Sequence, residues 1–291
     1  HHGVFMMNRE NPTALDFMLQ KPSTEKQAEL MQTHFALMDI GVWLLSDKAV
    51  EVLRKKCVGK DANINTYDLY SEFGCALGTH PSKPDAELES LNVAILPLPG
   101  EEFYHFGTAP ELLTSTISLQ NLVKDQRFII QKGVKRQTSV FTQNCLLENR
   151  PTKKNEYIWI ENSKLSAGWE LSRHNIVTGV PQNNWQISLK DGQCIDVVPI
   201  GEKAYALRVY GYNDPSRGAL DNEDTIYLGQ PFKEWAAARH LPLREFGIQD
   251  DIQSAQLFPV SESLEELEEL LHFILTGEGE AEFFLHSARL S

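Results

Sequence analysis

The chain has 291 residues, of which 42% are hydrophobic and 23% are charged, and its formal net charge is −13. This length allows one large domain or two to three smaller ones with a buried core, and the composition is typical of a soluble globular protein. The acidic balance argues against nucleic acid or an anionic membrane as the main partner, although a local positive pocket could still bind a nucleotide.

No run of about eighteen apolar residues could span a membrane, and the first residues lack the pattern of a secretion signal. Both ends of the chain cut into predicted elements, so we expect it to be a piece of a longer polypeptide. The cysteines lie far apart without metal-ligand spacing, which predicts reduced, buried thiols in a cytoplasmic protein. They are Cys57, Cys75, Cys145 and Cys194.

The first third of the chain alternates between strand and helix patterns. Residues 3–7, 16–20 and 36–45 are predicted strands, and residues 22–34 and 46–57 are predicted helices, the second with Ser46 as its N-cap. The long apolar stretch 36–45 is typical of a strand covered on both faces. This alternation predicts an α/β sheet.

One acid stands inside the apolar stretch, and it needs a partner. An ionised carboxylate at Asp39 is costly in apolar surroundings unless something pairs with it. Asp39, with Gly41 beside it, could bind Mg²⁺ or a sugar hydroxyl, and Lys21 could present its ammonium to a phosphate at the carboxyl end of a neighbouring strand. The alternative is a surface lysine beside the turn at Pro22 and an Asp39 satisfied by backbone.

A second candidate site precedes a helix. Residues 64–78 are a predicted helix, residues 91–108 two strands around a Pro-Gly turn, and residues 109–123 a helix capped by Thr108. His105, Gly107 and Thr108 could bind an oxygen-rich ligand at this helix N-terminus. Alternatively, His105 orders the turn, Gly107 supplies a backbone angle and Thr108 only caps the helix.

Beyond residue 123, apolar residues recur every six positions, which is typical of a parallel β-helix. We expect its strands to be extended by residues 182–201 and 203–214. The two runs with this spacing are Val134, Val140 and Leu146, and Trp159, Leu165, Leu171 and Val177.

The last part of the chain is predicted to be helical. Residues 231–240 form a short helix and residues 261–277 an acidic amphipathic helix with Ser261 or Ser263 near its cap. The glutamates of the second helix are interpreted as a solvated face, not a metal site. The predicted domains are therefore an α/β domain at 1–122, a β-helix at 123–230 and a helical segment at 231–291.

The common self-contained enzyme motifs are absent: the P-loop, GxGxxG after a strand, HExxH, paired CxxC and GxSxG. Several segments in order nevertheless resemble one family, the bacterial bifunctional L-fucokinase/GDP-L-fucose pyrophosphorylases. They include HGVFMM, LQKPS, LMDIGVWLLS, YDLYSEFGCALG, LPLPGEEFYHFGT, VYGYND and ARLS.

The resemblance implies a fold and an activity. The chain would hold the C-terminal part of a nucleotidyltransferase-like α/β domain, a left-handed parallel β-helix and the lead-in to a kinase domain that lies outside it. The intact enzyme would join GTP to L-fucose 1-phosphate with Mg²⁺, and its fused kinase would phosphorylate L-fucose. The family's Gly-rich nucleotide and ATP loops are not in this chain, so we expect this piece alone to be inactive.

The resemblance also implies residue roles. Lys21 matches the catalytic lysine of a Lys-Pro motif that contacts phosphate. Asp39 stands where related enzymes place an Asn or Asp that contacts the sugar or the metal. The residues themselves, and not the resemblance, make Gly41 and the second candidate site of His105, Gly107 and Thr108 the candidates for substrate binding.

Two other functions stay open. The chain could be a non-catalytic β-helix scaffold that links two catalytic domains or mediates formation of a homo-oligomer. It could also be an acyltransferase built from hexapeptide repeats, in which His174 would act as the base. The second alternative fits less well, because such enzymes have longer and cleaner repeats.

Overall fold

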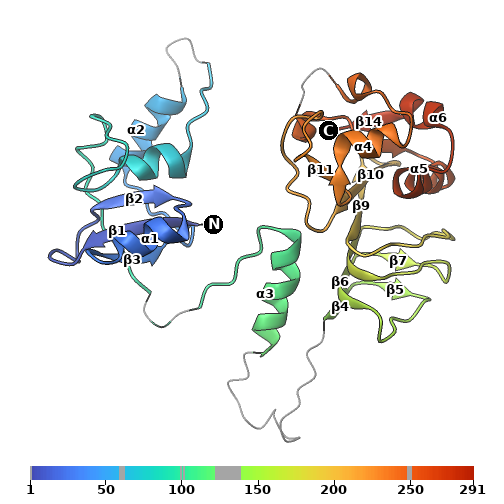
Figure 1. Ribbon diagram of the computed structural model, residues 1–291, viewed down its shortest axis with the longest axis horizontal. Coiled ribbons are helices and arrows are strands. Elements are labelled where there is room, and N and C mark those ends of the chain that lie inside the picture. The colour runs from blue at the N-terminus through green and yellow to red at the C-terminus, as the bar shows by residue number, and fades with distance from the viewer. Residues whose placement is uncertain (1, 59–62, 99, 101, 122–138, 248–250) are drawn as a thin grey trace, which may run out of the picture. The chain divides into compact units, whose positions relative to one another are not determined.

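A computed structural model describes residues 2–58, 63–98, 100, 102–121, 139–247 and 251–291. The chain divides into two compact units, His1–Phe103 (unit 1) and Tyr104–Ser291 (unit 2), and Figure 1 labels their elements. Each unit has its own hydrophobic core. None of the described helices is long and apolar enough to cross a membrane.

Unit 1 is built on a three-stranded sheet with the order β2-β1-β3, in which β1 is antiparallel to both neighbours. Ser23 and Ser46 cap α1 and α2, since each hydroxyl accepts a backbone N–H three residues later. The elements are β1 (Gly3–Asn8), β2 (Phe17–Gln20), α1 (Thr24–Leu30), β3 (His34–Met38), α2 (Asp47–Cys57) and two short helical segments, η1 (Leu69–Phe73) and η2 (Gly74–Ala76).

The apolar stretch 36–45 is not one long strand, so that prediction was wrong. β3 ends at Met38, and Gly41 has a φ of +78°, a left-handed conformation that interrupts an extended chain. The sheet that contains β3 is antiparallel, with β1 between β2 and β3.

The segment 91–108 was predicted to hold two strands, and the structure contains none among its described residues. Pro97 has no N–H to contribute to a ladder, and its neighbours Leu96 and Leu98 are exposed. The Pro-Gly turn itself lies partly outside the described residues. The helix predicted after this segment is present as α3 (Ala109–Asn121).

Unit 2 contains a β-solenoid, which confirms the fold predicted from the six-residue spacing (Figure 1). Its parallel strands bring residues 17 or 18 positions apart into register, as for Val140 with Ile158 and Ile160 with Val177. Three six-residue faces fit one such turn. The strands are β4 (Val140–Gln143), β5 (Leu146–Leu147), β6 (Glu156–Glu161), β7 (Lys164–Leu165), β8 (Arg173–Thr178) and β9 (Gln193–Ile200).

The assignment of inward-facing residues was wrong in part. Ile158 and Ile160 fill the interior, whereas Trp159 between them points to the outer face and packs beside Phe141 in the cluster that includes Leu113 of α3. Leu146 is exposed, and Val134 lies outside the described residues. Side chains alternate between the two faces of a strand, so Trp159, which follows the inward-facing Ile158, faces outward although it fits the six-residue spacing. Its outer face is the one that α3 covers.

Side-chain amides recur at one corner of the solenoid. Asn155 accepts from the N–H of Thr152, and Asn175 accepts from the N–H of Ser172, so each amide closes its own turn. Each also donates to carbonyl groups of the next turn, such as that of Leu171 for Asn155. At this corner, the asparagine side chains thus provide hydrogen bonds to backbone groups that lie outside the strands and have no partner in a neighbouring strand.

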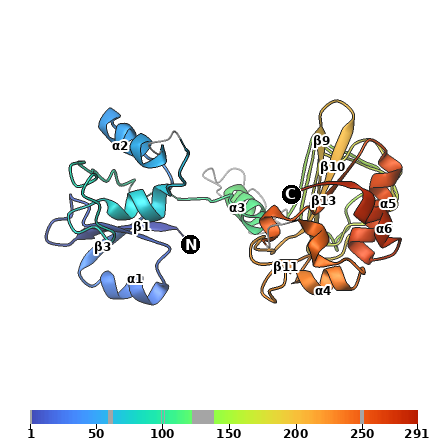
Figure 2. The ribbon, with the colours of Figure 1, turned by 90° about the horizontal axis from the view of Figure 1, so that it is seen from above.

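An antiparallel hairpin ends the parallel ladder. β9 pairs with β10, which continues to β13 and β14, and Figure 2 shows α5 and α6 beside this part of the sheet. The predicted helices 231–240 and 261–277 are present as α4 and α5, and Ser263 caps α5. The remaining elements are β10 (Ala204–Gly211), β11 (Ile226–Tyr227), β12 (Gln230–Pro231), α4 (Phe232–Ala237), two 3₁₀ turns, η4 (Leu243–Phe246) and η5 (Ile252–Ser254), β13 (Phe258–Ser261), α5 (Leu264–Thr276), α6 (Ala281–His286) and β14 (Ala288–Leu290).

A buried arginine joins two of these helices. Arg239, just after α4, is 6% exposed, and its guanidinium donates to the backbone oxygens of Trp235, Phe273 and Ile274. Its carbon Cζ lies 4.7 Å from the ring centre of Trp235. Burial lowers the pKa of Arg239, but carbonyl groups at the end of α5 stabilise its charge.

Candidate functional site

The first candidate site lies at one end of the sheet in unit 1. Gln20 at the end of β2 is in register with Gly3, and the N–H of Asp39, just after β3, donates to the oxygen of Gly3 at 2.9 Å. Because β2 and β3 are both antiparallel to β1, their carboxyl ends lie at the same end of the sheet, beside the start of β1. The structure therefore brings Lys21, which follows Gln20, and Asp39 to one end of the sheet.

The carboxylate of Asp39 is only half satisfied. Asp39 is 5% exposed, and its Oδ1 accepts from the N–H of Gly41 at 2.8 Å. Among the described residues, its buried Oδ2 has no hydrogen-bond partner, and neither has the buried Oε1 of Gln20. A Cβ added at Gly3 would lie 3.2 Å from Gln20 Oε1 and 3.4 Å from Asp39 Cβ, so both side chains occupy the same face.

This arrangement suits a ligand that donates hydrogen bonds or carries positive charge. Two buried acceptor oxygens without a donor destabilise the folded state. A ligand hydroxyl or a cation that binds both oxygens would remove this penalty. Lys21 is exposed and adopts a φ of +48°, an unfavourable conformation for a residue with a side chain. The strained lysine adds a positive charge to the same end of the sheet.

The second candidate site belongs to unit 2 and forms a helix cap. The hydroxyl of Thr108 accepts from the N–H of Glu111, while the Glu111 carboxylate accepts from that hydroxyl at 2.9 Å and pairs with His105 Nδ1 at 2.8 Å. A Cβ on Gly107 would lie 2.2 Å from the His105 ring, which explains the glycine by close approach. These contacts support the structural alternative for His105, Gly107 and Thr108, and their role as ligand-binding residues remains a prediction.

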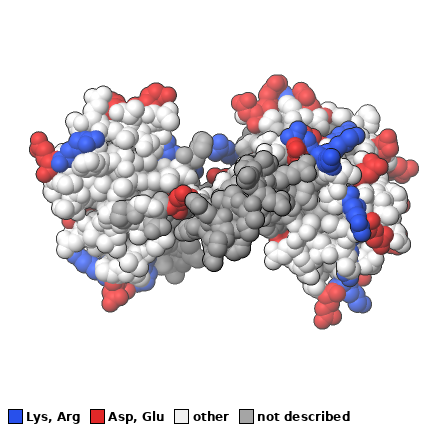
Figure 3. All heavy atoms as spheres, turned by 90° about the horizontal axis from the view of Figure 1, so that it is seen from below, with Lys and Arg blue, Asp and Glu red and all other residues white. Residues whose placement is uncertain are grey.

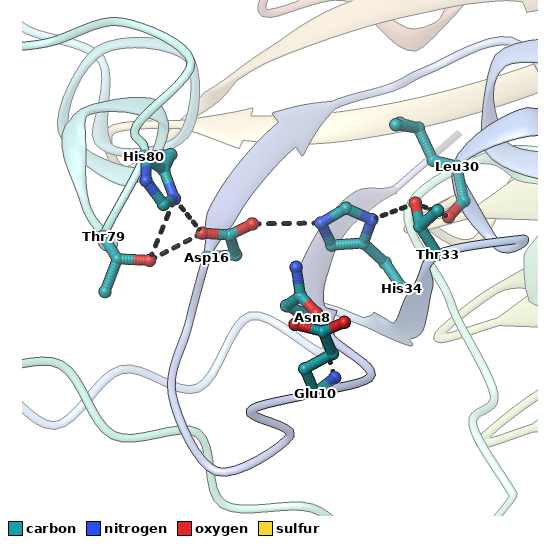
Figure 4. A network of polar contacts seen from close by, with 8 residues as sticks. All are labelled: Asn8, Glu10, Asp16, Leu30, Thr33, His34, Thr79 and His80. Carbon is teal, nitrogen blue, oxygen red and sulfur yellow. Dashed lines mark hydrogen bonds and ion pairs between the residues drawn. The ribbon is translucent and has the colours of Figure 1, made fainter.

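A third cluster was missed by sequence reasoning (Figure 4). The buried carboxylate of Asp16, just before β2, accepts from the Thr79 hydroxyl at 2.6 Å and pairs with His80 Nδ1 at 2.6 Å and His34 Nε2 at 3.0 Å. His34 Nδ1 in turn lies 2.8 Å from the Thr33 hydroxyl. The cluster ties three distant segments at the end of the sheet opposite to Asp39. The sequence signal, an Asp between Leu15 and Phe17, was the same as at Asp39.

We expect Asp16→Asn to destabilise unit 1 in a pH-dependent way. Burial raises the pKa of Asp16, but the hydrogen bonds from Thr79, His80 and His34 outweigh it and hold this pKa at about 2. A carboxyl whose pKa is lower in the folded state stabilises the fold above its unfolded pKa, and loses that effect as the pH falls toward 2. At pH 7 the variant should lose about 2 kcal/mol of the free energy of unfolding.

Amide exchange in β1, β2 and β3, corrected for intrinsic rates, checks this prediction between pH 2 and pH 7. The difference between wild type and Asp16→Asn should shrink as the pH falls from about 4 to about 2. The exposed Asp47, replaced by Asn at the start of α2, is the matched control. A difference that does not vary with pH would contradict the role given to the carboxylate charge.

The remaining polar clusters do not form a metal centre. In the part of the chain that the structure describes, no group of three or more His, Cys, Asp and Glu side chains is arranged to hold a metal ion. The glutamates Glu265, Glu266 and Glu269 of α5 are exposed, as predicted for a solvated face. His174 pairs with Asp191 at 2.7 Å, and its ring contacts those of Tyr157 and Tyr212.

Known proteins provide an independent comparison. The family model described as the fucose pyrophosphorylase domain matches residues 86–263. A Bacteroides fragilis protein named L-fucokinase/L-fucose-1-P guanylyltransferase is 46% identical over 278 residues, which cover 95% of this chain. The chain spans only 29% of the length of that relative. No solved structure matches the chain.

The segment that matches the family model includes the second candidate site but not the first. His105, Gly107 and Thr108 lie inside the matched segment, together with the solenoid and the start of the helical region, whereas Lys21, Asp39 and Gly41 precede it. The matched segment is more than half of the chain, and it contains the solenoid that the six-residue spacing predicted. The chain therefore belongs to the fucose pyrophosphorylase domain family.

Proposed function

We propose that this chain is part of an enzyme that transfers a guanylyl group from GTP to L-fucose 1-phosphate, giving GDP-L-fucose and pyrophosphate. The 46% identity to a protein with this activity in its name supports the proposal. The longer polypeptide would also carry a kinase that phosphorylates L-fucose with ATP. The substrates of the longer polypeptide would be small molecules. The four free cysteines support a cytoplasmic location for it.

The proposed domains follow the same assignment. Residues 1–122 would complete a nucleotidyltransferase-like α/β domain, residues 123–230 would form a left-handed β-helix, and residues 231–291 would lead to the kinase. Turns of 17 or 18 residues, equal to three hexapeptides, support the β-helix assignment. The β2-β1-β3 sheet, with Lys21 and Asp39 at one end, supports a substrate-binding role for the first domain.

In the proposed reaction, a phosphate oxygen of fucose 1-phosphate attacks the α-phosphorus of GTP. A new P–O bond forms there as the bond to the bridging oxygen of the β-phosphate breaks, and pyrophosphate leaves. The protein positions the reactants and balances charge, so no side-chain nucleophile is required. Lys21 would bind a phosphate as a point charge, and Asp39 would hold a sugar hydroxyl or a metal ion.

The residues at this site fit Mg²⁺. This ion prefers oxygen ligands and is often held by one or two carboxylates, with phosphates and waters completing its shell. The buried Oδ2 of Asp39 would be such a ligand, and the nearby Oε1 of Gln20 is another oxygen without a partner among the described residues. When bound, Mg²⁺ would neutralise charge on the phosphates.

Substitutions in the longer polypeptide test this proposal. Asp39→Asn keeps the acceptor for the Gly41 N–H and removes the charge, and Lys21→Gly removes the ammonium where the φ of +48° suits glycine. Each should lower pyrophosphate release from GTP and fucose 1-phosphate about a hundredfold, without unfolding the protein. Asp47→Asn and Lys26→Ala, at exposed positions of unit 1, are the matched controls.

The outcomes separate the site from the function. Wild-type turnover in folded Asp39→Asn and Lys21→Gly would reject these residues and leave the activity in place. If the unsubstituted polypeptide released no pyrophosphate with any sugar phosphate, the guanylyltransferase would be rejected. The solenoid would then be better explained as a scaffold between catalytic domains.

A further inference from the structure

The two edges of the sheet in unit 1 differ. The edge at β2 is bonded to a later segment: the N–H of Thr79 donates to the oxygen of Leu15, and the Ser82 hydroxyl donates to the oxygen of Met18 at 2.7 Å. In the part of the chain that the structure describes, β3 pairs only with β1, so its other edge has no partner. A free edge is a template for another strand.

Apolar side chains follow this free edge and continue past it. Every second residue from the end of β3 is apolar and exposed, and the fraction reaches 72% for Val42 and 84% for Leu44. The residues between them face the other way, since Asp39 is buried and Trp43 contacts Phe73. The four exposed residues, which we call the β3 strip, are Met38, Ile40, Val42 and Leu44.

The exposed large hydrophobic side chains are concentrated in unit 1. Among the described residues, thirteen of the nineteen exposed large hydrophobic side chains belong to unit 1. Figure 3 shows a face of unit 1, on the left, where charged side chains lie mainly at the margins. A row of exposed apolar side chains such as the β3 strip, beside an open edge, marks a surface that another polypeptide covers.

The comparison with the longer relative indicates what that polypeptide is. This chain corresponds to 29% of the relative, so the same kind of molecule contains much more polypeptide than these 291 residues. We propose that a β-strand from the part outside this chain pairs with the edge of β3 and covers the β3 strip. Backbone hydrogen bonds to β3 would provide affinity, and alternate apolar side chains would provide the fit.

This surface is distinct from the proposed substrate site. The β3 strip faces outward, whereas the Asp39 carboxylate is buried on the other side of the same segment. The added strand would extend the sheet, and its alternate apolar side chains would lie beside those of the β3 strip. A second copy of the chain is the competing occupant.

Hydrogen exchange compares the longer polypeptide with this 291-residue chain. Amides of residues 34–45 should exchange at least about tenfold more slowly in the longer polypeptide, because the edge is paired there. Val42→Lys should remove most of that protection and lower the melting temperature of the longer polypeptide, while leaving this chain's unchanged. Val198→Lys, at an exposed valine of β9, controls for the added charge.

Two results would overturn the proposal. The first is equal exchange of residues 34–45 in the two polypeptides, which would show that nothing outside this chain covers the edge. The second is a dimer of this chain, measured by light scattering, that Val42→Lys converts to a monomer. That result would assign the β3 strip to a second copy.

Discussion

Arg239→Met should lower the free energy of unfolding of unit 2 by about 4 kcal/mol. Methionine fills similar volume but cannot donate to the three carbonyl groups of Trp235, Phe273 and Ile274. The Phe273 oxygen keeps the N–H of Gly277 and the Ile274 oxygen keeps the indole N–H of Trp235, so the loss comes from three missing hydrogen bonds to a charged donor in the core. Arg239→Lys should recover only part of the loss, since an ammonium does not reproduce the planar guanidinium.

Urea denaturation followed by tryptophan emission measures this effect, because four of the five tryptophans belong to unit 2. Arg244→Met is the matched control, since the Arg244 side chain is 84% exposed and its ion pair among the described residues is with the neighbouring Glu245. It should change the free energy by less than about 0.5 kcal/mol. Similar losses for both variants would show that the buried guanidinium has no special role.

Asn175→Ala should lower the free energy of unfolding by about 3 kcal/mol. The side chain is fully buried, accepts from the N–H of Ser172 at 2.8 Å, and donates to the oxygens of Lys190 and Gln193. Alanine would leave the N–H of Ser172 without its acceptor and would remove the side-chain donor from both oxygens, of which that of Lys190 still accepts from the N–H of Gln193. Because each turn of a solenoid rests on its neighbour, the loss should spread beyond its own corner.

Asn184→Ala, at an exposed position of the same solenoid, is the control for this change. Thermal unfolding of both variants gives the comparison, and equal melting temperatures would contradict the role of the corner amide. Asn175→Asp adds a second test. It keeps the acceptor but places a carboxylate against two carbonyl groups, so this variant should gain stability as the pH falls and the acid becomes neutral.

Local sequence signals predicted local structure well. The caps at Ser46, Thr108 and Ser263 depend on a hydroxyl and an N–H three residues away, so the sequence contains both partners. The solenoid was also predictable, because its apolar residues recur every six positions in the sequence. The strands at 36–45 and 91–108 were not, since a strand requires a partner that propensity does not specify.

The candidate site shows the same division. The apolar context of Asp39 predicted a buried carboxylate in need of a partner, and the structure shows a buried oxygen without one among the described residues. The cluster of Asp16, His34 and His80 could not be assembled from sequence, because the two histidines lie 18 and 64 positions from Asp16 and reach it only in the folded unit. Gln20 was missed because an amide at a strand end carries no distinctive pattern.

The solenoid of unit 2 also sets a step length for the molecule. Each turn uses 17 or 18 residues and adds one parallel strand, which advances the stack by about 4.8 Å. The β9–β10 hairpin ends the parallel ladder, so the elements that follow it are carried at a distance fixed by the number of turns. Insertion or loss of a whole turn would move them by one step and keep every inward side chain in place. A one-residue change within a strand would instead turn its inward side chains outward, whereas a corner can absorb one residue, as the turns of 17 and of 18 residues show.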